Sequence, residues 1–357
     1  MTTSRRPHVS ICIPAYNAAG TLVATLDSIL AQDYPAIDVV VSDNHSNDDT
    51  RKVIEAYATK GVRYCSPPTP PTWSANLPSF IGAYVNSNFV LSQGCGDFLC
   101  LFHADDLYDP TIVRKQVAAL QADRRAGAVF TAYRCVGEQG QPVPAPTGTA
   151  QIPREFRDRR AFSFAELFNG VLRHGNFLAT PSVMLRRSVR ETIGDFDEQR
   201  FRTSADLDMW FRIARCRGVA LLAEPLLNYR ISKRQFGSQY NDLRTVPGDF
   251  LLVMDHYLSQ PGVRDVLDRK ALRFYALQRS ADELFCARHL LLQRRTAEAE
   301  TRLRAALNHQ HWRTALRRPA RIRSLVAGLV LYTATRIGLG TSAAERLDQV
   351  TQWRSRR

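Results

Sequence analysis

Strand-like and helix-like segments alternate through the first 65 residues, and this alternation limits the chain to one class of fold. The apolar run at residues 9–14 is typical of a buried strand, and residues 20–32 follow it with apolar side chains at helical spacing. Residues 37–41 are β-branched except for Asp38, as expected of a strand covered on both faces. A second helical stretch ends at Gly61, and residues 62–65 form a third strand. This βαβαβ order predicts an α/β fold with a mostly parallel sheet flanked by helices, which binds ligands at the carboxyl ends of its strands.

Composition supports a folded protein and places the excess charge at one end. Of 357 residues, 45% are hydrophobic and 23% are charged, which excludes collagen-like, low-complexity and wholly disordered chains. The formal net charge is +14. Residues 262–357 hold 20 basic and 8 acidic residues, a net of +12, against 28 and 26 in the preceding part, a net of +2. No nucleic-acid-binding module accompanies this charge, so we expect no nucleic acid partner.

The cysteines and the N-terminal residues indicate a cytoplasmic protein. There are seven cysteines, an odd number, with no Cys-x-x-Cys pair, which favours reduced thiols over a disulfide framework or a zinc site. No apolar stretch of the signal-peptide type precedes the first strand. The longest apolar run, residues 324–335, is well short of the roughly 20 residues that cross a bilayer. We therefore expect a cytoplasmic location and no transmembrane span.

Acidic residues follow separate elements of this pattern. Asp43 ends one strand, Asp105 and Asp106 follow another, and Asp206 begins a helix. Because parallel strand ends meet at one edge of a sheet, these carboxylates can share one site. Adjacent carboxylates repel each other and are tolerated more readily beside a cation, which predicts an oxygen-ligand site for Mg²⁺ or Mn²⁺. The alternative is that Asp105 or Asp106 only caps the helix that begins near Pro110.

Five motifs follow one another over about the first 240 residues. They are VSICIPAYN at 9–17, VVSDNHSNDDT at 40–50, GDF with HADD at 96–106, GDFDE at 194–198, and DLDMWFR with YR at 206–230. Each motif is weak alone, but their order and spacing together resemble the family 2 glycosyltransferases of the GT-A fold. The C-terminal hundred residues lie outside this resemblance.

The resemblance implies both an architecture and an activity. Residues 1–240 would form a GT-A (Rossmann-like) catalytic domain, with a nucleotide-sugar half over about 1–107 and an acceptor half over about 108–240; residues 241–357 would form a helical, basic C-terminal region. The activity would be inverting transfer of a sugar from a nucleotide-diphosphate donor to a hydroxyl of a glycan or lipid-linked acceptor, in bacterial cell-envelope polysaccharide synthesis. The alternative is a non-catalytic nucleotide-sugar-binding scaffold protein with the same fold.

The resemblance also assigns residues to the donor. Pro14 and Tyr16 would line the pocket of the nucleotide base, and Asp43 would accept a hydrogen bond from the base. Asp105 would contact the ribose or the metal, and Asp106 would hold the Mn²⁺ or Mg²⁺ cofactor that bridges the diphosphate. From the residues alone, Pro14 can simply end a strand, Tyr16 can be a half-buried aromatic, and Asp43 can be a turn residue.

Asp206 matches the family's catalytic base, near the start of a helix that faces the acceptor hydroxyl. The sequence departs from the family pattern twice, with Ala205 where many members carry Glu and His103 where many carry the first Asp of Asp-x-Asp. The first departure leaves Asp208 as an alternative base, although it points away from the face of Asp206 and is expected to face solvent or pair with an arginine. His103 is either a neutral metal ligand or a packed strand-end histidine, and we favour packing.

Four further residues are candidates for acceptor or diphosphate contacts. His174 and Asn176 lie in a region that forms part of the acceptor side in similar enzymes. Trp73, in a proline-rich loop, is a candidate sugar platform. Arg230 lies where a mobile segment can cover the diphosphate, with a solvated basic strand end as the alternative.

Arginines directly precede an apolar run at residues 325–332 in the basic C-terminal region. This arrangement suits a helix that lies in an anionic membrane surface. It predicts peripheral binding to the inner face of the cytoplasmic membrane, which fits an acceptor carried on a lipid. The alternative is a helical bundle with an ordinary basic exterior.

Overall fold

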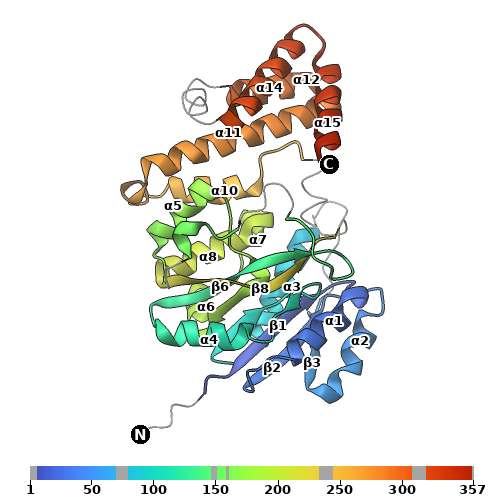
Figure 1. Cartoon of the computed structure of the whole chain (residues 1–357), viewed down its shortest axis with the longest axis vertical. Helices are drawn as coiled ribbons and strands as arrows, with labels where there is room; N and C mark the ends of the chain where they lie inside the picture. The colour runs from blue at the N-terminus through green and yellow to red at the C-terminus, as the bar shows by residue number, and fades with distance from the viewer. Residues whose placement is uncertain are drawn as a thin grey trace. The chain divides into compact units, whose positions relative to one another are not determined.

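A computed structural model of the chain describes residues 6–69, 79–145, 151–157, 161–232, 244–307 and 319–355. The chain forms two compact units, Met1–Gln235 and Phe236–Arg357 (Figure 1). The sequence predicted a boundary at residue 240, which lies outside the described residues. The division of the first unit into donor and acceptor halves stays a prediction.

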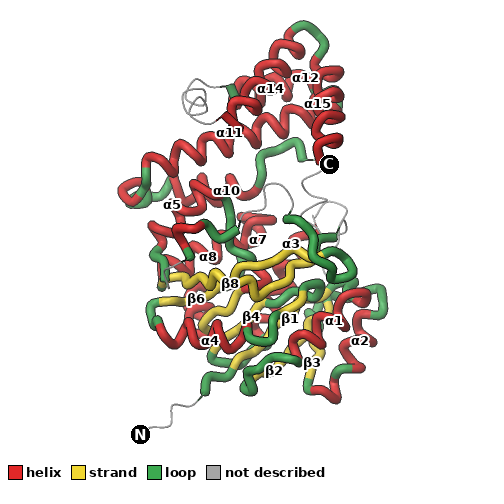
Figure 2. The backbone as a smooth tube through the Cα atoms, viewed as in Figure 1, coloured by secondary structure: helices red, strands yellow, loops and turns green. Residues whose placement is uncertain are grey.

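A sheet of eight strands lies at the centre of the first unit, within its described residues (Figure 2). Its order is β3-β2-β1-β4-β7-β6-β8-β5. The first four of these run parallel, as predicted, whereas β7 is antiparallel to both of its neighbours and makes the sheet mixed. The strands are β1 (Val9–Ala15), β2 (Ile37–Asp43), β3 (Val62–Cys65), β4 (Phe98–Leu101), β5 (Leu107–Tyr108), β6 (Ala126–Val136), β7 (Val183–Arg186) and β8 (Gly218–Arg230).

Helices pack against this sheet, so the predicted α/β class is confirmed. Helix α3 contacts β1 and β2, and helices α4 and α8 contact β6 and β8. The described α-helices of this unit are α1 (Ala19–Leu30), α2 (Thr50–Ala56), α3 (Ser79–Ser92), α4 (Ile112–Ala122), α5 (Phe164–His174), α6 (Arg187–Ile193), α7 (Glu198–Phe201) and α8 (Ala205–Cys216).

The core of the first unit explains the apolar runs seen in the sequence. Val9, Ile11 and Ile13 of β1 are fully buried, and Leu22 and Leu26 of α1 pack in the same cluster. Burying one such side chain stabilises the fold by roughly 1.5–3 kcal/mol, so this cluster fixes the strand positions that support the site. All seven cysteines are free thiols.

The second unit is helical, as predicted. Its described helices are α10 (Asp249–Leu258), α11 (Arg269–Leu292), α12 (Thr296–Ala306), α14 (Pro319–Arg336) and α15 (Gly340–Ser355). Helix α11 packs against α12, α14 and α15. Buried side chains from all four, including Leu290, Leu303, Leu331 and Ala344, form one core cluster. None of the described helices combines the length and the apolarity that a membrane span requires.

Candidate functional site

The ends of three parallel strands meet at one edge of the sheet, which we call the carboxyl edge. Ala15 of β1 and Asp43 of β2 are register partners there, and Leu101 ends β4 at the same edge. Strand β7 reaches this edge from the other direction, because its first residue, Val183, pairs with Leu101. Residues predicted for donor binding therefore gather at the ends of β1, β2 and β4.

Asp43 is buried and is held by the turn that follows β2. Its Oδ1 accepts hydrogen bonds from the Ser46 backbone N–H at 3.1 Å and from the Ser46 hydroxyl at 2.5 Å. Its backbone carbonyl accepts a hydrogen bond from the Ser66 hydroxyl at 2.9 Å. Asp43 is thus a turn residue, as the sequence allowed, and the contacts with Ser46 orient its carboxylate. A contact between Asp43 and a nucleotide base stays a prediction.

Pro14 and Tyr16 lie at the end of β1 beside Asp43. Pro14 is half-buried, and Tyr16 is 45% exposed. The next residue, Asn17, has a φ of 49°, and its Oδ1 accepts a hydrogen bond from the Asn47 backbone N–H at 2.9 Å. This bond ties the loop after β1 to the loop after β2. An exposed aromatic ring near a buried carboxylate suits stacking on a base, and the role of both residues stays a prediction.

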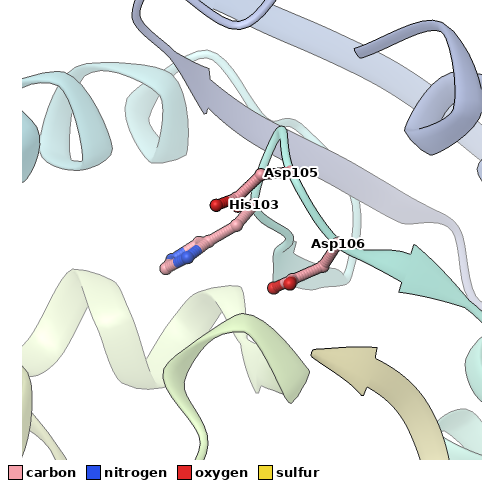
Figure 3. Close-up of side chains that lie close together, drawn as sticks. All are labelled: His103, Asp105 and Asp106. Atoms are coloured by element: carbon pink, nitrogen blue, oxygen red, sulfur yellow. The ribbon is translucent and has the colours of Figure 1, made fainter. Parts of the chain in front are cut away.

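Three side chains with metal-binding atoms gather after β4, in a segment that we call the acidic turn: His103, Asp105 and Asp106 (Figure 3). One ligand atom of each lies within 4.8 Å of the others. The Thr25 hydroxyl of α1 donates to the Asp106 carbonyl at 2.8 Å. The His103 backbone N–H donates to the Tyr108 hydroxyl at 2.6 Å. These contacts hold the backbone of the acidic turn in place.

Asp106 is fully buried and has one carboxylate oxygen without a partner. Its Oδ1 accepts a hydrogen bond from the Arg230 backbone N–H at 2.8 Å, whereas its Oδ2 has no hydrogen-bond partner among the described residues. Burial, and then the charge of Asp105, hold the pKa of Asp106 well above its ordinary value. A buried carboxyl with an orphaned oxygen is stabilised by a proton or by a cation. Together with the neighbouring carboxylate and imidazole, it fits a divalent metal ion.

His103 is half-buried, and burial lowers the pKa of its ring, while the neighbouring Asp105 acts in the opposite direction. The imidazole is therefore neutral near physiological pH, which is the form that binds metals. We favoured simple packing from the sequence, but the ring also offers a nitrogen beside two carboxylates. Packing of His103 stays the prediction, and metal ligation stays its alternative.

The helix-capping alternative for the two aspartates is wrong. Helix α4 begins at Ile112, and its N-cap residue, Thr111, makes no side-chain capping bond. The local turn is held by Asp109, which accepts a hydrogen bond from the Thr111 backbone N–H at 2.9 Å. Neither Asp105 nor Asp106 therefore caps α4, and both belong to the acidic turn.

Arg230 is the last residue of β8 and is buried. Its Nε donates to the Asp105 carbonyl at 2.6 Å, and its Nη1 donates to the carbonyls of Gly137, at 3.2 Å, and Glu138. The side chain therefore fixes the acidic turn to the end of β6, and it is neither a solvated strand end nor part of a loose segment. A diphosphate contact by Arg230 stays a prediction.

Asp206 lies in the first turn of α8 and is half-buried. Its Oδ2 accepts a hydrogen bond from the Thr180 hydroxyl at 2.6 Å, and its Oδ1 accepts one from the Leu207 backbone N–H at 2.7 Å. Burial raises the pKa of Asp206, and the hydrogen bonds from Thr180, Leu207 and Tyr84 only partly offset that rise. No motif marks Thr180 or Tyr84 in the sequence, because their importance comes from contact with Asp206.

Asp208 has a different environment two residues further along α8. It is buried, and its Oδ2 accepts a hydrogen bond from the Arg212 Nε at 2.8 Å. The same guanidinium donates to the carbonyls of Ile193 and Asp195. The expected arginine pairing is therefore present, solvent exposure is not, and Asp208 serves the packing of α8.

Within the part of the chain that the structure describes, no hydrogen bond or ion pair joins the remaining predicted residues to the carboxyl edge. His174 ends α5 and lies 3.2 Å from the Glu155 carboxylate. Asn176 accepts a hydrogen bond from the Leu178 backbone N–H at 3.1 Å, which shapes its own loop. Trp73 lies outside the described residues. Their acceptor or diphosphate roles stay predictions.

Comparisons with known proteins identify the family of the chain. The model of the family described as Glycosyl transferase family 2 matches residues 10–194, more than half of the chain. A glycosyltransferase of Rickettsia typhi, itself uncharacterized, is 26% identical over 64% of this chain and 65% of its own length. The amylovoran biosynthesis glycosyltransferase AmsB of Erwinia amylovora is 28% identical over 65% of this chain and 72% of its own length.

The fold also has counterparts among solved structures. The mannosyltransferase PcManGT of Pyrobaculum calidifontis, solved in complex with GDP-Man and Mn²⁺, superposes with a TM-score of 0.55 at 18% identity, over 96% of this chain and 85% of that one. At such low identity, this likeness shows the GT-A fold alone. The alignment spans less than two thirds of the length of the Rickettsia protein. Since the family model covers more than half of the residues, the chain belongs to glycosyltransferase family 2.

Proposed function

We propose that this chain is an inverting glycosyltransferase, which moves a sugar from a nucleotide-diphosphate donor to a hydroxyl of an acceptor. The observation that carries the proposal is that two kinds of carboxylate converge on the carboxyl edge. One is the acidic turn after β4, and the other is Asp206, which Thr180 holds just before the start of β7. The acidic turn can hold a cation that binds phosphate, and Asp206 can accept a proton.

Asp206 is the general base of this reaction. The acceptor oxygen attacks the anomeric carbon from the face opposite the nucleoside diphosphate, and Asp206 accepts the hydroxyl proton as the new bond forms. The bond from the anomeric carbon to the diphosphate oxygen breaks, its electron pair stays on the diphosphate, and the anomeric configuration inverts. Burial makes Asp206 more basic, and the Thr180 hydroxyl orients one of its oxygens.

The donor lies across the ends of β1, β2 and β4. Pro14 and Tyr16 line the base pocket, Asp43 accepts a hydrogen bond from the base, and Asp105 contacts the ribose or the metal. Asp106 holds Mn²⁺ or Mg²⁺ in the acidic turn. A cation held there would supply positive charge that stabilises the leaving diphosphate. The complex of PcManGT with GDP-Man and Mn²⁺ supports this class of donor and cofactor.

The acceptor is a glycan or a lipid-linked sugar of the bacterial cell envelope. The name of AmsB, which refers to amylovoran biosynthesis, supports a role in polysaccharide assembly. His174 and Asn176 are the acceptor-side candidates in the described part of the chain.

A screen of nucleotide sugars with Mn²⁺ tests the proposal directly. The full chain is expected to hydrolyse one donor slowly and to lose this turnover in EDTA. Binding of a donor without any turnover, with and without candidate glycan acceptors, would instead favour the scaffold alternative. A chain that binds no nucleotide sugar contradicts both.

An exposed apolar face supports peripheral binding at the cytoplasmic side of the membrane. Val326, Leu329 and Val330 of α14 are 46–51% exposed, and they recur at helical spacing in the most basic part of the chain. Apolar side chains with surrounding positive charge suit an anionic lipid surface.

Val330→Asp should abolish sedimentation with vesicles that contain phosphatidylglycerol. Leu252→Asp, at a position of α10 that is 43% exposed, is the matched control. Unchanged sedimentation of the Val330 variant contradicts this partner.

A further inference from the structure

A hollow lies at the opposite edge of the sheet, which we call the amino edge. Strands β1 and β4 begin there and β7 ends there, because Phe98 pairs with both Val9 and Arg186. The hollow has a volume of about 830 Å³. Four arginines from three separate segments line it: Arg124, Arg186, Arg187 and Arg217.

The positive charge of this amino-edge hollow is not balanced by its own lining. The two acidic residues there are already engaged: Asp97 accepts a hydrogen bond from a backbone N–H at 2.8 Å, and Glu191 pairs with Arg187 at 3.3 Å. Within the described residues, neither Arg124 nor Arg217 lies within salt-bridge distance of a carboxylate. Two guanidinium charges therefore remain unmatched in the hollow.

Arg186 is held rigidly in the wall of the hollow. Its Nε donates to the Ala126 carbonyl at 2.8 Å, and its guanidinium lies 5.4 Å from the centre of the Phe98 ring. Burial, and then the charges of Arg217 and Arg124, lower its pKa, while the charge of Asp123 acts in the opposite direction. The arginines therefore repel one another, and an anion between them would relieve that repulsion. An anchored guanidinium also loses little freedom when it binds.

We propose that the amino-edge hollow binds a phosphate-bearing anion, at a site separate from the donor site. The planar guanidinium group matches the oxygens of a phosphate with paired hydrogen bonds. The volume lies within the range of small-molecule pockets, so the hollow has room for a phosphate and for the group that carries it. Two sources share this chemistry, namely a soluble phosphorylated compound and the headgroup of a phospholipid. The site does not depend on the proposed transfer reaction.

Calorimetric titration of the full chain with inorganic diphosphate in EDTA tests the proposal, because the chelator keeps metal out of the acidic turn. The double variant Arg124→Gln/Arg217→Gln removes two exposed side chains without carboxylate partners and, with them, an exposed hydrogen bond from Arg217 to the Arg124 carbonyl at 3.3 Å, so the fold should persist. Its affinity for diphosphate should fall at least about tenfold, the scale of one charged hydrogen bond. Arg125→Gln, at a neighbouring exposed arginine that pairs with Asp123 and does not line the hollow, should bind as the wild type does.

Two further measurements complete the test. Glu191→Gln leaves the hollow more positive and should tighten diphosphate binding. Vesicles with phosphatidic acid in a neutral lipid background separate the two sources. If the wild type binds these vesicles but not diphosphate, and the double variant loses vesicle binding, the ligand is a lipid headgroup. If the wild type binds diphosphate but not the vesicles, and the double variant loses diphosphate binding, the ligand is a soluble compound. If the wild type binds neither probe, or if the double variant binds both probes as the wild type does, the proposal is overturned.

Discussion

Acidic side chains gather at one edge of the sheet and arginines at the other, and the helix dipoles account for only part of this difference. In βα units the helices begin near the carboxyl edge and end near the amino edge, so acids are favoured at the first and bases at the second. Arg186 fits this explanation, because its guanidinium donates to the Leu120 carbonyl in the last turn of α4. The orphaned oxygen of Asp106 does not, because it is buried and accepts no hydrogen bond from a helix end or from any other group in the described residues. A charged group that no helix end or neighbouring side chain compensates is thus a better sign of a ligand site than the sign of the charge at an edge.

The largest expected effect lies at the carboxyl edge. Asp206→Asn keeps the size of the side chain but removes the proton acceptor, so kcat should fall by about 10² or more, while donor affinity is preserved. Single-turnover transfer and a separate nucleotide titration measure the two quantities.

Asp208→Asn is the control for the Asp206 variant, since Asp208 lies on the same helix. It weakens a buried ion pair with Arg212, so the free energy of unfolding should fall by about 1–3 kcal/mol with little change in kcat. An inactive Asp208 variant beside an active Asp206 variant would mean that the base is assigned to the wrong residue.

The metal site should give the next largest effect. Asp106→Asn can still accept the hydrogen bond from Arg230 but loses the negative charge, so affinity for Mn²⁺ should fall at least about tenfold. Electron paramagnetic resonance of free Mn²⁺ measures this without donor or acceptor. His103→Ala should weaken binding less, and Mn²⁺ affinity that neither substitution changes would remove the cation from the acidic turn.

The pH dependence of transfer should report on Asp206. Burial raises its pKa above the ordinary 3.8, and a base works only when deprotonated. At saturating donor and Mn²⁺, kcat should therefore fall as the pH is lowered, with a midpoint above 3.8. A midpoint at or below that value would show that another group accepts the proton.

Asp43→Asn should produce a smaller effect, because a contact with the base is remote from the reacting carbon. Affinity for the nucleoside diphosphate should fall about 3–10-fold, with kcat almost unchanged. Titration of the nucleotide beside steady-state kinetics separates the two. A large loss of kcat at unaltered affinity would be inconsistent with a base contact.

The smallest effect is expected at the amino edge. Arg124→Gln/Arg217→Gln removes charge at the opposite end of the strands from the acidic turn, so kcat without added phosphate compounds should stay within about twofold of the wild type. Transfer assays on both proteins check this. A large loss of kcat would show that the two edges of the sheet are energetically coupled.

Short-range patterns were sufficient to predict the strands and helices that carry the site. The β-branched run before Asp43 and the apolar run before Asp105 and Asp106 each predict a buried strand, and strand direction alone places their ends at one edge. The sequence did not predict the reversal at β7, because a strand of four residues looks the same in either direction.

Only the tertiary structure decided how each acidic side chain is held. Asp106 is bonded to Arg230, 124 residues later, and Asp206 is bonded to Thr180, 26 residues earlier. Neither pair has a spacing that a helix or a strand would repeat, so no local pattern reveals it. The chain by itself determined which residues end which strands. The order of strands across the sheet determined their partners, their burial and therefore their acidity, because hydrogen bonds and desolvation depend on neighbours in space.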